Sequence, residues 1–301
     1  MVRVSAVKDY ILAEFSLIKI DGELTKPATL LVEKVAGALG VIYEPTKIKR
    51  KAKADAEAEK IKAIAKLEIS DLEHRALSRL VKQEARKQKN IEEITAVAAE
   101  NLPADAKVAD LEEDWVAYFF KQCEHVSDKE MQTVWAKLLT GEATKPGTYS
   151  KRTVDLISSI DKKDAELFTN LCSFVCDFGG PTLLIYDSEN EIYNKNQINF
   201  STLKHLDSLG LLSFESVSSY IKKKVGKNAT LYYFGRLTEI EFSKDDDNQF
   251  STGKVMLTGS GRELVNICGA SPNEEFYQYF CGKLSNQGLI LSSLIVPGRS
   301  F

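Results

Sequence analysis

Apolar residues recur at helical spacing up to about residue 178, and beyond it they form short runs typical of strands. The first helical pattern begins at Thr25, where Pro27 suits the first turn, and Gly40 and Pro45 close it. One face of this helix carries four apolar residues: Leu31, Val35, Leu39 and Ile42. Such a face packs into a core, contacts a protein partner or lies on a membrane surface, and these alternatives stay open.

The segment 46–103 differs because alanine and charged residues dominate it. It predicts a long, solvated helix with a narrow alanine stripe, followed by a second helix that begins at the capping box Ser70–Glu73. Only a short polar stretch separates the two helices, so we expect an antiparallel helical hairpin. A third, short helix then ends just before Pro103.

The segment 104–178 predicts a compact helical bundle. Trp115 and Trp135 lie among other large apolar residues at helical spacing, so we assign both to its core. Glu142 follows a helix and precedes a Pro-Gly turn, and we expect it to pair with Arg152 and fix that turn.

Beyond residue 179 a helix that ends at Gly210 precedes two antiparallel strands and a helix that Thr258 caps. This order is typical of a winged-helix domain, and the alternative is a small α+β domain with a similar order. The final stretch, LSSLIVPGRSF, is interpreted as a divergent tail.

These patterns predict a mainly α protein: an N-terminal helical hairpin and a compact helical bundle followed by a small α+β winged-helix-like domain. The predicted segments are an apolar helical lead at 1–45, the basic hairpin at 46–103, the bundle at 104–178 and the winged-helix-like domain at 179–301.

Composition also indicates the cellular compartment of the protein. The net charge of the 301 residues is −3, so no global basic field indicates nucleic acid. The 5 cysteines are scattered through apolar helical patterns, which indicates reduced thiols in a cytosol. The N-terminal stretch lacks the features of a signal peptide, and no apolar run reaches the roughly 18 residues of a membrane span. We therefore expect a cytoplasmic protein, with peripheral contact at the inner membrane as the alternative.

Positive charge gathers in three stretches that suit the phosphates of nucleic acid or of anionic lipid. The candidate residues are Lys47, Lys49, Arg50, Lys51 and Lys53, then Arg79, Lys82 and Arg86, then Lys222, Lys223 and Lys224 in an expected loop at 220–227. The competing interpretation of the first two groups is a solvated hairpin whose interleaved acids keep it soluble. Because the hairpin has no aromatic residue, nucleic acid bound there would be recognised without sequence preference.

No constellation of residues predicts catalysis. Cys123, His125, Cys172 and Cys176 lack the paired spacing of a structural zinc site, and cysteines one helical turn apart are usually core thiols. Phosphate-binding loops and nucleophile elbows are missing from the sequence as well. We therefore expect a non-enzymatic protein with no metal, no cofactor and no small-molecule substrate.

An ordered series of segments resembles a known family. PTKIKRKAKADAEAEKIKAIAK precedes KQKNIEEITAVAAE, and the stretch Asp114–Phe168 follows. Together they resemble the bacterial domain of unknown function 2806 family over roughly residues 25–178, and more weakly to about residue 270. The resemblance implies no catalytic residues. The middle block is also distantly similar to helical proteins from abortive-infection loci.

Two functions are consistent with these features. The first is a bacterial interaction or scaffold protein that acts in anti-phage defence of the abortive-infection type, through self-association, protein partners or the membrane surface. The alternative is a nucleic-acid-binding regulator that uses the basic hairpin and the winged-helix-like domain. Against the alternative, the candidate recognition helix STLKHLDSLG is poor in base-reading side chains, and the candidate wing FSKDDDNQF is acidic.

Overall fold

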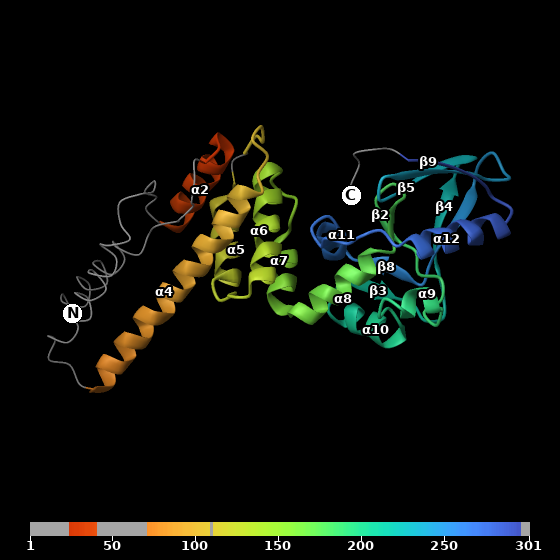
Figure 1. The fold of residues 1–301 in the computed structure, drawn as a ribbon. Coiled ribbons are helices and arrows are strands. Elements are labelled where there is room, and N and C mark those ends of the chain that lie inside the picture. The colour runs from red at the N-terminus through yellow and green to blue at the C-terminus, as the bar shows by residue number, and fades with distance from the viewer. Residues whose placement is uncertain (1–23, 41–70, 109–110, 296–301) are drawn as a thin grey trace. The chain divides into compact units, whose positions relative to one another are not determined.

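The computed structural model describes residues 24–40, 71–108 and 111–295. The chain divides into two compact units, which we call unit 1 (Met1–Lys151) and unit 2 (Arg152–Phe301). Figure 1 shows their elements, and each unit is described by itself. Among the described residues, no helix combines the length and the apolar character that crossing a bilayer requires.

The division falls inside the segment 104–178 that the sequence suggested as one bundle. Residues after the boundary are tied to the C-terminal part of the chain by side-chain hydrogen bonds. The Thr153 hydroxyl donates to the Glu263 carboxylate at 2.6 Å, and the Thr169 hydroxyl donates to the Cys268 carbonyl at 3.0 Å. Such contacts over about 100 residues of chain have no local sequence signal.

Unit 1 contains four described helices: α2 (Lys26–Leu39), α4 (Asp71–Glu100), α5 (Glu113–Cys123) and α6 (Lys129–Thr144). Helix α4 packs against α2 and α6. Trp115 stacks on Phe119 with 5.1 Å between the ring centroids, and Phe119 meets Trp135 edge to face at 5.2 Å. All three rings are buried, so the prediction that both tryptophans belong to the core is confirmed.

Helix α4 is continuous over 30 residues, where the sequence suggested two shorter helices. The suggested break fell at a polar stretch that ends in Asn90. That residue is only 2% exposed, and its amide donates to the Glu124 carbonyl at 2.9 Å. Because a tertiary partner satisfies this amide, the polar residue continues the helix. The other arm of the predicted hairpin lies outside the described residues.

The turn after α6 is fixed by Glu142, but through different partners from the one predicted. Its carboxylate accepts hydrogen bonds from the backbone N–H groups of Gly147 at 2.6 Å and Tyr149 at 2.9 Å, in place of the expected pair with Arg152. Glu142 is 5% exposed, and the two amides provide the partners that a buried carboxylate requires.

Unit 2 begins with helices α7 (Lys151–Ser159, which starts at the boundary) and α8 (Lys162–Cys172). Strands β1 (Val175–Asp177) and β2 (Pro181–Leu183) and helices α9 (Glu191–Asn194) and α10 (Phe200–Ser208) follow. The strands β3 (Leu212–Phe214), β4 (Tyr220–Val225), β5 (Asn228–Tyr233), β6 (Arg236–Glu241), β7 (Asn248–Gly253) and β8 (Val255–Leu257) come next. Helices α11 (Gly259–Val265) and α12 (Glu274–Asn286) and strand β9 (Ile290–Ile295) complete the unit.

The strands form one five-stranded antiparallel sheet, in the order β2-β1-β5-β6-β9, and two antiparallel pairs, β3-β8 and β4-β7. Helix α12 packs on one face of the large sheet, where Phe276 and Phe280 are fully buried. The Tyr277 hydroxyl lies 2.7 Å from the buried Thr238 hydroxyl of β6. Strand β9 corrects the interpretation of the final stretch as a divergent tail.

The predicted succession of a helix, two antiparallel strands and a returning helix is present only in part. The strands on either side of the candidate wing FSKDDDNQF, β6 and β8, do not pair with each other, and β8 pairs with β3 between α10 and α11. Gly210 adopts a left-handed conformation with φ 81° after α10. The side chain of Thr258 caps α11 by accepting from the Gly261 N–H at 3.0 Å, as the sequence predicts. A side chain at Gly261 would collide with the Leu211 carbonyl, so glycine is required where α11 meets this turn. The chain is thus mainly helical, with an antiparallel sheet in its C-terminal part.

Candidate polyanion-binding face of helix α4

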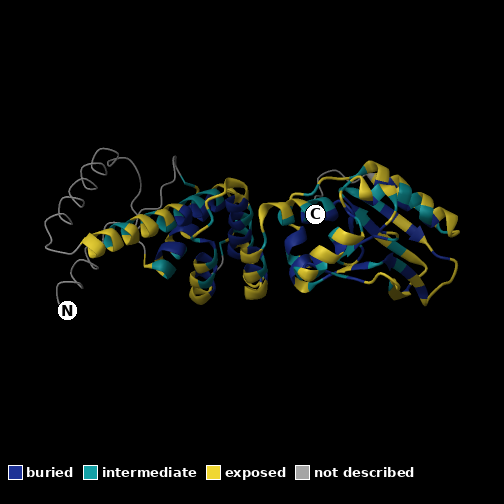
Figure 2. Cartoon of the chain, turned by 90° about the horizontal axis from the view of Figure 1, so that it is seen from below, coloured by how far each residue is buried: buried dark blue, intermediate teal, exposed yellow. Residues whose placement is uncertain are grey.

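Helix α4 changes environment halfway along its length. Its last eleven residues bury one side in the core of unit 1, through Asn90, Ile91, Ile94, Thr95, Ala98 and Ala99. Its first half is largely exposed, and Figure 2 shows this change from exposed to buried colours along the helix. The exposed half is therefore held in place by the buried half and remains available to a ligand.

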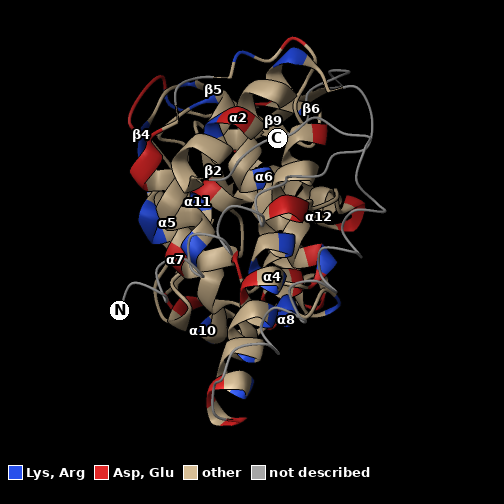
Figure 3. Ribbon diagram, turned by 90° about the vertical axis from the view of Figure 1, so that its left-hand side faces the viewer, with Lys and Arg blue, Asp and Glu red and all other residues tan. Residues whose placement is uncertain are grey.

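Four cations lie on one side of the exposed half. Arg75, Arg79, Lys82 and Arg86 are spaced by four, three and four residues, which places them along one face of a helix. All four side chains are exposed, and Figure 3 shows the lysines and arginines of α4 in blue. At about 1.5 Å rise per residue, the row extends over about 16 Å. We call these four residues the basic face.

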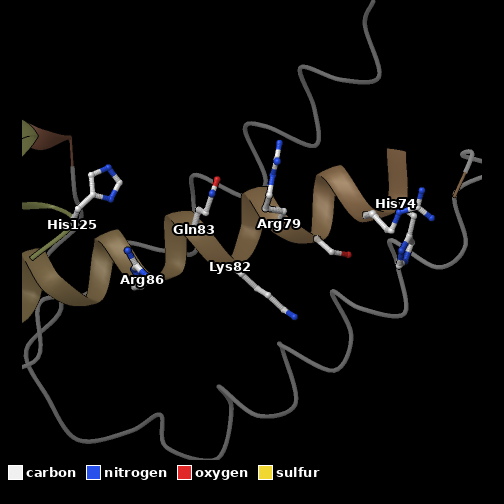
Figure 4. A pocket seen from close by; sticks show the side chains of 8 residues that line it. His74, Arg79, Lys82, Gln83, Arg86 and His125 are labelled. Atoms are coloured by element: carbon white, nitrogen blue, oxygen red, sulfur yellow. The ribbon is translucent and has the colours of Figure 1, made fainter. Parts of the chain in front are cut away.

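The basic face lines a hollow of about 520 Å³. The other residues that line it are His74, Ser78 and Gln83 from α4 and His125 from the turn after α5. Figure 4 shows these side chains from close by, with Arg79, Lys82 and Arg86 on successive turns of α4. Every lining side chain carries a hydrogen-bond donor, and none carries a carboxylate. The hollow therefore suits an anion with several acceptor oxygens.

The cations of α4 outside the basic face have acidic partners. Lys87 lies 3.0 Å from Glu124 and 3.1 Å from Glu84, and Lys89 lies 3.9 Å from Glu93. The hydrogen bonds to Glu124 and Glu84 raise the pKa of Lys87 above its ordinary value. In the described part of the chain, by contrast, no ion pair joins a residue of the basic face to an acid. Among the described residues, the positive charge of this face thus has no acidic counterpart.

The two large apolar residues exposed on α4 differ in direction. Leu72, 68% exposed, lies roughly 50° from the mean direction of the basic face at 100° per residue. Leu80 is 50% exposed and lies in line with the buried Ile91, three turns further on. At 100° per residue, the mean direction of the four cations lies roughly 140° from that of the six buried residues. A helix that lies on a membrane needs its basic residues beside its apolar face. Because the apolar side of α4 packs into unit 1, the basic face suits an anionic surface, and either a soluble polyanion or lipid headgroups supply one.

The first group of predicted polyanion-binding residues lies outside the described residues: Lys47, Lys49, Arg50, Lys51 and Lys53. The second group, Arg79, Lys82 and Arg86, is brought together by α4. Arg75 belongs with this group by spacing alone. His125 could not have been placed beside it from sequence, because α5 comes back to α4 only in the folded unit.

The third predicted group belongs to a strand instead of the loop that the sequence suggested. Lys222, Lys223 and Lys224 lie in β4, which pairs with β7. The Lys222 ammonium lies 4.5 Å from the centroid of the Phe178 ring and donates to the Phe178 carbonyl, so this charge is engaged within unit 2. The nearby Lys227 forms a 3.4 Å ion pair with Asp245 of the acidic turn.

Two basic side chains of the candidate recognition helix α10 also pair with acidic residues of unit 2. His205 Nε2 lies 2.6 Å from Asp164, and the Lys204 ammonium lies 3.5 Å from Asp207. Side chains that already have carboxylate partners are poorly placed to read bases. Both candidate side chains of α10 thus have acidic partners within unit 2.

The residues predicted to contact a partner or a membrane lie mostly in the core. Leu31 and Val35 of α2 are fully buried in unit 1, and this overturns their interpretation as contact residues. They are buried because α2 packs against α4 and α5. Leu39 is partly exposed at the end of α2, and Ile42 lies outside the described residues.

The cysteines and histidines considered as metal ligands do not form a cluster. No group of three or more potential ligands comes together among the described residues. Cys123, Cys172 and Cys176 are buried, and burial raises the pKa of each thiol well above its ordinary value. Such thiols stay protonated near neutral pH and behave as apolar core side chains.

Comparisons with known proteins identify a family and no nearer relative. No curated protein and no solved structure matches the chain. One family model, described as a protein of unknown function (DUF2806), matches residues 74–281, which is more than half of the chain and includes the whole basic face. The chain therefore belongs to the DUF2806 family.

Proposed function

We propose that the protein binds the phosphate backbone of nucleic acid, and that the basic face of α4 is the contact surface. The observation that carries this proposal is the row of four exposed cations without acidic partners in the described chain, all lining one hollow. Arginine side chains suit phosphate because the planar guanidinium donates two parallel hydrogen bonds to its oxygens.

The dimensions of the face support a backbone contact. Its length of about 16 Å corresponds to about five base pairs of duplex, enough for a few phosphates of one strand. Base recognition is not part of the proposal, because α4 carries no aromatic side chain for stacking and Gln83 is the one amide in the hollow. Binding is therefore indifferent to sequence and weakens steeply with salt.

Within this proposal, unit 2 serves as a protein-binding module with a winged-helix origin. The order α9, α10, β3, β8 and α11 supports the winged-helix assignment, with β4–β7 inserted between β3 and β8. The acid-paired His205 and Lys204 support a role other than base reading.

The test is fluorescence anisotropy of labelled oligonucleotides of two unrelated sequences, single- and double-stranded, titrated with the full chain at low and high salt. We expect similar affinities for both sequences and a strong loss at high salt. The variant Arg79→Glu/Lys82→Glu/Arg86→Glu is expected to lose binding. The matched control, Lys107→Glu/Lys121→Glu/Lys145→Glu, changes the net charge equally on exposed lysines of unit 1 outside the hollow, and it is expected to retain binding.

Two results would reject the proposal. Equal losses in the variant and in the control would show that total charge, not the basic face, determines affinity. Binding of the unaltered chain to anionic lipid vesicles but not to oligonucleotides would assign the face to a membrane instead.

A further inference from the structure

The two edge strands of the five-stranded sheet in unit 2 differ in how readily they can pair with a further strand. Strand β2 at one edge has 3 residues and begins with Pro181, and both features discourage pairing with a further strand. Strand β9 at the other edge has 6 residues, and its sequence ILSSLI contains no charge and no proline. Within the described chain, β9 pairs with β6 alone and leaves its outer edge unpaired.

The side chains of β9 alternate between two environments. The Ser293 hydroxyl lies 2.9 Å from the Tyr277 hydroxyl of α12, so this residue faces the helix-covered side of the sheet. Ile290 and Leu294 point to the opposite side and are 65% and 63% exposed. An uncharged edge strand with exposed apolar side chains is a template for a further strand.

We propose that β9 pairs antiparallel with β9 of a second copy of the chain, which joins the two five-stranded sheets into one. With the two-fold axis at Ser292, Ile290 of one copy lies opposite Leu294 of the other on the same face, and Ser292 lies opposite its own counterpart. Apolar side chains thus meet apolar side chains at both ends of the contact, and no like charges on β9 face each other.

A second copy fits this edge better than an unrelated peptide because the strand is complementary to itself. Its exposed face carries Ile290 and Leu294 on either side of Ser292, so reversing the strand about Ser292 preserves the pattern of that face. A two-fold contact of this kind uses the free edge of both copies, and the assembly stops at a dimer because the other edge is blunted by β2. The inference concerns unit 2 and does not depend on nucleic-acid binding by α4.

The first test is sedimentation equilibrium of the full chain over a range of concentrations. We expect a monomer–dimer equilibrium, and we expect Ile290→Lys/Leu294→Lys to raise the dissociation constant at least roughly tenfold, because lysines on an edge strand oppose pairing. Both side chains are exposed, so the variant keeps the fold of unit 2. Val217→Lys is the control, since it adds a lysine at an apolar residue of unit 2 that is 96% exposed and lies outside the sheet. A monomer at every concentration, or a dimer unaffected by the two lysines, would overturn the proposal.

A cross-link tests the register. Residues directly opposite each other in an antiparallel pair have Cα atoms roughly 4.5–5.5 Å apart, within the range of a disulfide. Ser292→Cys is therefore expected to give a covalent dimer on mild oxidation with diamide. The unaltered chain and Asn286→Cys, an exposed position at the end of α12, are expected to stay without the cross-link. A chain that sediments as a dimer but fails to cross-link at residue 292 would place the contact elsewhere and reject the proposed pairing.

Discussion

The basic face of α4 and the lysines of β4 show that equal runs of positive charge in a sequence can become different surfaces. On α4, spacing by three and four residues places Arg75, Arg79, Lys82 and Arg86 on one side of a helix. On β4, the three consecutive lysines lie where the pairing with β7 is irregular, between Lys222 and Val225, and Lys224 has a left-handed backbone with φ 58°, so they do not form a regular row. Lys222 is further occupied by Phe178, whereas no acid of the described chain pairs with the basic face.

The difference teaches that spacing and partners determine a polyanion-binding surface more than the number of cations does. A phosphate backbone presents charges along a line, and a row of exposed cations on one helix face meets several of them at once. Lysines at an irregular stretch of a strand do not form such a row, and a lysine that contacts its own protein, as Lys222 contacts Phe178, must first lose those contacts.

Charge reversal on each surface is the most direct test of whether the basic face of α4 binds polyanions and the lysines of β4 do not. We expect Arg79→Glu/Lys82→Glu/Arg86→Glu to lower the affinity for an oligonucleotide at least about 100-fold at low salt, because three attractions become repulsions. We expect Lys223→Glu/Lys224→Glu, both exposed on β4, to lower it less than about threefold. Anisotropy titrations measure both values, and comparable losses would remove the distinction between the two surfaces.

A second variant tests whether the stability of unit 1 can change without a change in oligonucleotide affinity. Glu142→Ala leaves the N–H groups of Gly147 and Tyr149 without their carboxylate, so we expect the free energy of unfolding to fall by about 1–3 kcal/mol. Urea denaturation of the variant and the unaltered chain measures the change. Oligonucleotide affinity of the folded variant should be unaltered, and a large change in affinity would show that the turn itself takes part in binding.

A smaller effect is expected when the basic face loses one charge. Arg79→Ala should reduce the slope of log affinity against log salt concentration by about 1, because one phosphate contact disappears. The loss in affinity should be similar for unrelated sequences. Lys223→Ala on β4 is the comparison and should leave the slope unaltered.

The smallest effect is expected at a paired cation of α4. Lys87 interacts with Glu124 and Glu84, so Lys87→Met should lower the free energy of unfolding by less than about 1 kcal/mol near pH 7 and leave oligonucleotide affinity nearly unaltered. Because these hydrogen bonds raise the pKa of Lys87, their contribution is complete below the ordinary value of 10.5 and disappears as pH rises through the higher folded value. Urea denaturation of both chains at neutral and at strongly alkaline pH should show the stability difference closing.

Much of the fold could be predicted where the signals are local. Thr25 and Thr258 were identified as helix caps because a cap needs only a side chain and the N–H three residues ahead. Two tryptophans at helical spacing with other apolar residues were enough to assign a core.

Prediction failed where distant partners decide the outcome. Asn90 suggested the end of a helix, and only its hydrogen bond to Glu124 explains why α4 continues. Strand β9 looked like a tail because its pairing with β6 spans about fifty residues of chain. For the site, spacing alone found Arg79, Lys82 and Arg86, but nothing in the sequence indicates that His125 lines the same hollow. The anti-phage role and the absence of enzymatic activity stay predictions.

The placement of the two tryptophans has a spectroscopic consequence. Trp115 and Trp135 are the 2 tryptophans of the chain, and both are buried in unit 1, where the Trp115 indole donates to the Tyr149 carbonyl at 2.9 Å. Tryptophan emission therefore reports on unit 1, while circular dichroism reports on both units. Emission and circular-dichroism transitions that coincide on heating would mean that the two units melt cooperatively, and separate transitions would give each unit its own melting temperature.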